Sequence, residues 1–156
     1  MTKIITIIAL FIASLVSAQG QFEQGMGKAL QTWKEGKPAE AVAQLERIAS
    51  VEKTNWLPNY YIALINTTQA FGEQDKTKML SLIESAQKAQ DFCNDLAMDN
   101  PEVLVMQAMI HTASIVYDPM TNGQKLSGDV MYILNKAYKI APENPRVVFQ
   151  KASFEI

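Results

Sequence analysis

The chain has 156 residues, of which 48% are hydrophobic and 19% are charged, and its formal net charge is −2. This composition excludes an intrinsically disordered chain and supplies enough apolar residues for one compact domain with a core. The small negative charge, without any basic cluster, also argues against a protein that binds nucleic acid or an anionic membrane surface.

Residues 1–18 predict a secretory signal peptide. Lys3 precedes an apolar run over residues 4–16, and Val16-Ser17-Ala18 ends in the small residues that signal peptidase requires. A helix of thirteen residues would span about 20 Å, which is short of the roughly 30 Å hydrocarbon core of a bilayer. We therefore expect cleavage before Gln19, and a periplasmic or secreted protein that keeps no integral membrane segment.

Three later segments open alike, with an asparagine that is followed closely by a proline. They begin at Asn55, Asn100 and Asn144, and the starts are 45 and 44 residues apart. Asparagine is a strong helix N-cap, and proline at the first helical position sacrifices no hydrogen bond. An alanine lies eight residues after each start, where a small side chain lets two helices approach closely. The equivalent alanines are Ala63, Ala108, Ala152 and, in an earlier helix that opens near Phe22, Ala29.

Each of the first three of these helices is followed by a second helix with an apolar stripe. We expect the second helices over residues 38–50, about 75–98 and about 127–141. In the middle one, apolar residues from Leu82 to Leu96 step by 4, 3, 4 and 3 positions, which is the helical period. This stripe includes the only cysteine, Cys93, which we expect to be buried. No segment alternates like a strand, so we predict an all-α fold of antiparallel helical hairpins.

Turn-forming residues mark the links between the helices. Gly36-Lys37-Pro38 predicts a tight turn, and residues 72–75 predict a slightly longer link. The stretch from Asp118 to Gly123 is the richest in turn formers, so we expect the longest loop of the domain to begin at Asp118 and to run up to the helix expected from about residue 127.

The hairpin pattern resembles the tetratricopeptide repeat, most clearly in ALQTWKEGKPAEAVAQLERIAS (residues 29–50) and in LNKAYKIAPENP (residues 134–145). The resemblance implies a right-handed solenoid of about three and a half units over residues 19–156. The family repeats every 34 residues, as Ala29 and Ala63 do, but the next two intervals are 45 and 44 residues. A HEAT-like array, with a period of 40–47 residues, is the alternative.

The resemblance also implies a function and a surface. The first helices of a tetratricopeptide array line a concave groove, so we expect a non-enzymatic scaffold that binds a protein or peptide partner through that groove. The corresponding residues are Met26, Leu30, Trp33, Tyr60, Leu64, Thr67, Val105, Met109, Thr112, Arg146 and Phe149.

The sequence offers little support for catalysis. His111 is the only histidine and has no partner set for a nucleophile or a metal, so we expect a hydrogen-bonded, partly buried side chain. We expect neither a cofactor nor a metal. The alternative is an enzyme or small-ligand binder whose site lies around residues 118–129 or beyond residue 156.

The segment after Asn144 predicts the first helix of a fourth unit without its second helix. Its apolar residues, among them Phe149, lie on most sides of the expected helix. A terminal cap should present one polar face to solvent. We therefore expect that the array continues in a longer protein, the alternative being that this helix is itself the cap.

Overall fold

A computed structural model describes residues 20–155, so the predicted signal peptide lies outside the described residues. Within this range all regular structure is helical. The helices cover residues 20–34, α2 (Pro38–Val51), α3 (Leu57–Gly72), α4 (Lys76–Ala97), α5 (Pro101–Tyr117), α6 (Pro119–Ile140) and α7 (Pro145–Glu155). None of the described helices is both long enough and apolar enough to cross a membrane.

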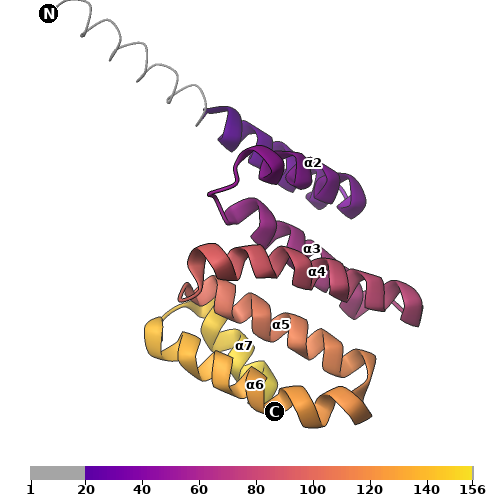
Figure 1. Cartoon of the computed structure of the whole chain (residues 1–156), viewed down its shortest axis with the longest axis vertical. Helices are drawn as coiled ribbons and strands as arrows, with labels where there is room; N and C mark the ends of the chain where they lie inside the picture. Colours follow the sequence, from indigo (N-terminus) through magenta and orange to yellow (C-terminus); the bar gives the residue numbers. More distant parts are fainter. Residues whose placement is uncertain (1–19, 156) are drawn as a thin grey trace, which may run out of the picture.

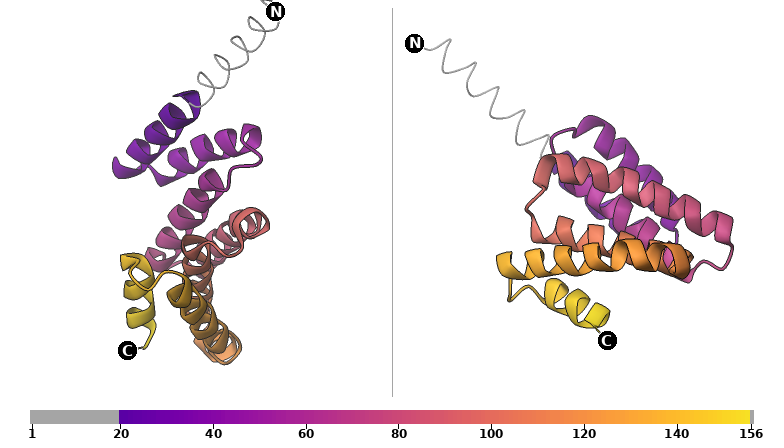
Figure 2. Two further views of the ribbon diagram at one scale, coloured as in Figure 1. Left: turned by 90° about the vertical axis from the view of Figure 1, so that its left-hand side faces the viewer. Right: turned by 60° about the horizontal axis from the view of Figure 1, so that its bottom comes forward.

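From α2 to α5 the helices follow one another in chain order along the long axis of the molecule, and α6 and α7 lie together at its far end (Figure 1). From α2 onward, each helix packs on the next one, and α5 also packs on both α3 and α7. Helix 20–34 lies beside α2, to which a hydrogen bond of 3.2 Å from Gln44 to Thr32 joins it. Of the first helices of the hairpins, α5 therefore contacts both α3 and α7, and the stack can be followed from two further sides in Figure 2.

Asparagine caps begin the later first helices, as the sequence predicted. The Asn100 side chain accepts a hydrogen bond from the Glu102 backbone N–H at 2.9 Å, and Asn144 accepts one from Arg146 at 2.9 Å. Asn55 accepts from the N–H of Leu57 at 3.0 Å, although Trp56 is the capping position of α3. These side chains satisfy backbone donors that the first turn leaves without a helical partner.

The predicted loop that begins at Asp118 is wrong. Helix α6 starts at Pro119, and Asp118 caps it by accepting a hydrogen bond from the N–H of Thr121 at 3.1 Å. The Asp-Pro pair that suggested a turn is equally suited to start a helix. Gly123 and Gly128 then lie inside α6, where each glycine costs up to about 1 kcal/mol relative to alanine.

The core follows the repeat positions. Ala29, Ala63 and Ala108 are 0%, 0% and 2% exposed, whereas the equivalent Ala152 in α7 is exposed. Cys93 is 0% exposed, which confirms its predicted burial. Burial alone raises the pKa of its thiol to about 12, so the sulfur is a core group and not a reactive thiolate.

Candidate functional site

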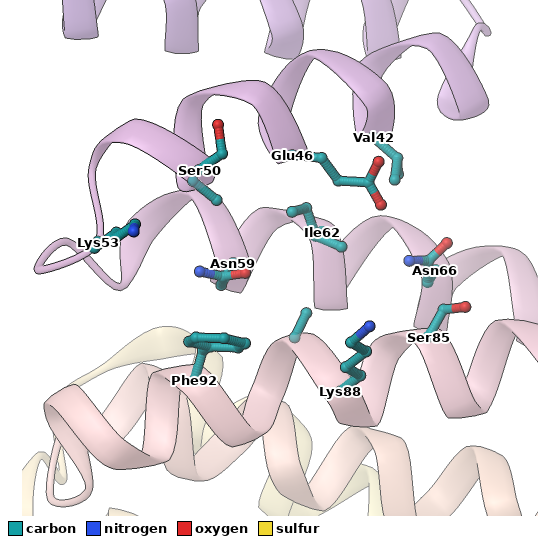
Figure 3. Close-up of a pocket in the computed structure, with 12 residues that line it drawn as sticks. Val42, Glu46, Ser50, Lys53, Asn59, Ile62, Asn66, Ser85, Lys88 and Phe92 are labelled. Carbon is teal, nitrogen blue, oxygen red and sulfur yellow. The ribbon is translucent and has the colours of Figure 1, made fainter.

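A groove of about 430 Å³ lies between α2 and α4 (Figure 3). Both helices pack along α3, which forms the floor, and no comparable packing joins α2 to α4. The groove is lined by Val42, Glu46, Ala49, Ser50, Lys53, Asn59, Ile62, Asn66, Ser85, Lys88, Ala89 and Phe92.

Three residues of α3 form the floor. Asn59, Ile62 and Asn66 are spaced three and four residues apart, so they lie on one face of the helix. Ile62 is 5% exposed and Asn66 is 6% exposed. Neither asparagine side chain hydrogen-bonds to another described residue, and the polar atoms of both amides reach the surface of the groove. These two amides can therefore donate to and accept from a ligand in the groove.

The walls combine apolar contact with charge. Val42 and Ala49 come from α2, and Ala89 and Phe92 come from α4, where the Phe92 ring remains 54% exposed. Glu46 and Lys88 extend from opposite walls in Figure 3.

Lys53, in the link between α2 and α3, adds a second positive charge to the lining. None of these three charged groups forms an ion pair with a described residue, so the lining carries two unpaired positive charges and one unpaired negative charge.

The eleven residues predicted to line an inner surface lie elsewhere, and none of them lines this groove. Five are buried in the core: Met26, Tyr60, Leu64, Thr67 and Val105. Five are half-buried: Leu30, Trp33, Met109, Thr112 and Arg146. Phe149 is 66% exposed, and Thr112 borders a small cavity of about 50 Å³ among α5, α6 and α7. A buried side chain cannot reach a partner unless the core opens, so packing accounts for the first five.

Two of the predicted residues do meet, around a carboxylate that the sequence analysis missed. The hydroxyl of Tyr60 donates to Glu102 Oε2 at 3.1 Å, and Arg146 Nη1 lies 3.6 Å from the same oxygen. Asn144 Nδ2 donates to Glu102 Oε1 at 2.7 Å, and the Arg146 guanidinium lies 5.6 Å from the Tyr60 ring centre.

Burial raises the pKa of the Tyr60 hydroxyl, with Glu102 adding to the rise and Arg146 opposing it. The cluster ties the starts of α3, α5 and α7 together, and its charges are already paired.

The histidine is not fully hydrogen-bonded, contrary to expectation. His111 is half-buried, and its Nδ1 is buried without a hydrogen-bond partner among residues 20–155. Burial lowers the pKa of the imidazole, and the nearby Asp129 carboxylate partly opposes this shift. The described residues contain no group of three or more His, Cys, Asp and Glu side chains that could hold a metal ion.

No family model, no curated protein and no solved structure matches the chain. The sequence carries one signal for the groove between α2 and α4. Asn59 and Asn66 share a face of a helix whose other central residues are mostly apolar. That signal does not show that α2 and α4 would diverge enough to leave the face open.

Proposed function

We propose that this protein is an exported, non-enzymatic scaffold that binds a linear segment of a partner protein in the groove between α2 and α4. The predicted leader supports a periplasmic or secreted location. The resemblance of residues 29–50 to a tetratricopeptide unit, with the packing of α5 on both α3 and α7, supports a right-handed solenoid of that kind.

The unpartnered amide of Asn66 carries this proposal. The residue is 6% exposed, its amide has no hydrogen-bond partner among the described residues, and its polar atoms reach the open groove that it lines. A hydrogen bond from a ligand to this amide would contribute about 0.5–1.5 kcal/mol. The amide can donate and accept, which suits the carbonyl and N–H groups of a peptide main chain.

The remaining lining favours a peptide over an ion or a compact polar ligand. The exposed Phe92 ring lies on one wall and the Ile62 side chain lies on the floor, so an apolar side chain would find contacts on two sides. Aromatic residues of this kind often dominate the affinity of protein–peptide contacts. The charges of Glu46 and Lys88 stand at opposite rims, where they would orient a partner more than hold it.

A library of displayed random linear peptides, selected against the full chain, tests the proposal. We expect enrichment of peptides that bind the parent protein and lose affinity with Asn66→Leu or Phe92→Ser. The matched control is Asn135→Leu, which changes an exposed asparagine of α6 outside the groove. If the selected peptides bind the parent and both groove variants equally, or if none is enriched, the groove is not a peptide site.

A further inference from the structure

The spacing of the two floor amides identifies the conformation of the segment that would fit. This step rests on the proposed function, because it concerns the ligand of the same groove. Asn59 and Asn66 are seven residues apart on α3, which places them about 10.5 Å apart along the helix axis at 1.5 Å per residue. Seven residues also complete nearly two turns, so both amides emerge on the same side.

Three ligand conformations can be compared with this spacing. A helical peptide has used its main-chain groups internally, so it offers few to either asparagine. A β-strand presents main-chain groups on one edge at every second residue, which gives spacings of about 7 and 13 Å. A polyproline II segment repeats every three residues at about 3.1 Å each, which gives about 9.3 Å. Of these values, the last lies closest to the amide spacing, from which it differs by about 1.2 Å.

The wall opposite α2 suits the same conformation. Polyproline II segments dock on exposed aromatic rings, and they lose little conformational entropy because they are preformed. The Phe92 ring is 54% exposed at the edge of this groove, and Ile62 lies between the two amides on the floor. A proline or another apolar residue between the two bonded positions would contact both side chains.

The charges of the lining favour an acidic segment. Lys53 and Lys88 exceed the single carboxylate of Glu46, and none of the three has an ion-pair partner among the described residues. The positive excess is local, because the whole chain carries a net charge of −2. An acidic side chain that faces Lys88 would therefore be attracted without displacing an existing pair.

We propose that the groove binds an acidic linear segment in the polyproline II conformation, with Asn59 and Asn66 hydrogen-bonded to main-chain groups three residues apart. Ile62 and Phe92 hold an apolar residue between those two points, and Lys53 and Lys88 select an acidic neighbour.

The test uses peptides enriched from the random displayed library on the full chain, synthesised with a fluorescent label. Proline replaces each position in turn, and fluorescence polarisation gives the affinity. We expect most positions to tolerate proline within about threefold, because its fixed φ matches this conformation and its missing N–H leaves the carbonyl acceptors intact.

Variants of the protein test the remaining contacts. Asn59→Leu and Asn66→Leu should each weaken binding by about threefold or more, whereas Asn135→Leu should leave it unchanged. Lys88→Glu should remove the preference for acidic peptides, and Lys139→Glu, on an exposed position of α6, should preserve it.

The outcomes separate the two proposals. If no displayed peptide is retained through the groove, the proposed function fails and this inference fails with it. If peptides are retained and depend on Asn66, but proline at most positions weakens them more than about tenfold, the segment is a strand or a helix and the inference is overturned. Enrichment of basic peptides would overturn it equally, while leaving peptide binding intact.

Discussion

Replacing Gln90 by leucine should stabilise the protein, although it deletes two hydrogen bonds. Gln90 is 0% exposed and occupies the place in α4 that the buried residues Leu45 and Leu134 hold in α2 and α6. Its Nε2 donates to the Val103 carbonyl at 2.8 Å and to Asn94 Oδ1 at 3.0 Å. Its Oε1 has no hydrogen-bond partner in the described part of the chain.

The magnitude follows from these contacts. Each lost hydrogen bond costs about 0.5–1.5 kcal/mol, and removing the unpartnered acceptor returns about 1–3 kcal/mol, so the two effects nearly cancel. The apolar surface that leucine adds to the core contributes roughly a further 1 kcal/mol. Asn94 keeps a hydrogen bond of 3.2 Å to Gln107 after the change. We therefore expect Gln90→Leu to raise the free energy of unfolding by about 1 kcal/mol.

Urea unfolding followed by circular dichroism at the helical band measures this change. The slope with urea should stay constant, which would show that the folded and unfolded states are unaltered in compactness. Gln90→Ala is the matched variant, because it removes the same polar atoms and leaves a cavity, and it should lower stability by about 2 kcal/mol or more. If the leucine variant is destabilised as much as the alanine variant, the hydrogen bonds of Gln90 outweigh its unpartnered oxygen and the reasoning is refuted.

Three further substitutions test the stability of the fold. Gly128→Ala should raise the free energy of unfolding in urea by about 0.5–1 kcal/mol, because Gly128 lies inside α6 with open space around it. No gain from this substitution would indicate that residue 128 lies in a loop. Gly36→Ala should lower the free energy of unfolding by about 1 kcal/mol, because Gly36 has a φ of +78°, which alanine rarely adopts. Burial lowers the pKa of His111 below its unfolded value of 6.5, so the folded state binds this proton less readily than the unfolded state. The neutral imidazole therefore contributes to the free energy of unfolding fully above about pH 6.5, and this contribution is lost as the pH falls towards the folded pKa. In unfolding curves measured across that range His111→Gln should flatten this part of the pH dependence, and an unchanged profile would contradict the assignment.

Local signals predicted most of the helices. The caps at Asn100 and Asn144 depend on contacts within three residues along the chain, so the sequence alone shows where α5 and α7 begin. The start of α6 was missed because Asp118 and Pro119 are favoured both in turns and at helix starts. The cap bond to Thr121 distinguishes the two, and it is visible only in the structure.

The groove was less predictable than the helices. Asn66 is notable in the sequence chiefly because Asn66-Thr67-Thr68 matches a glycosylation acceptor, and in the structure it is buried in a helix. Its importance depends on the separation of α2 and α4, which is set by packing between residues distant in the chain. The tetratricopeptide resemblance implied a binding surface on the first helices of the hairpins and not between α2 and α4. Two of the residues that it implied, Tyr60 and Val105, pack into the core.

The most direct test of peptide binding in the α2–α4 groove is a nuclear magnetic resonance titration of the full chain with a library-selected peptide. The side-chain amide signals of Asn59 and Asn66 should shift together with backbone signals of α2, α3 and α4, because both amides gain hydrogen bonds. Shifts confined to α5 and α7, around Phe149 and Arg146, would place the ligand on the other surface and contradict the account.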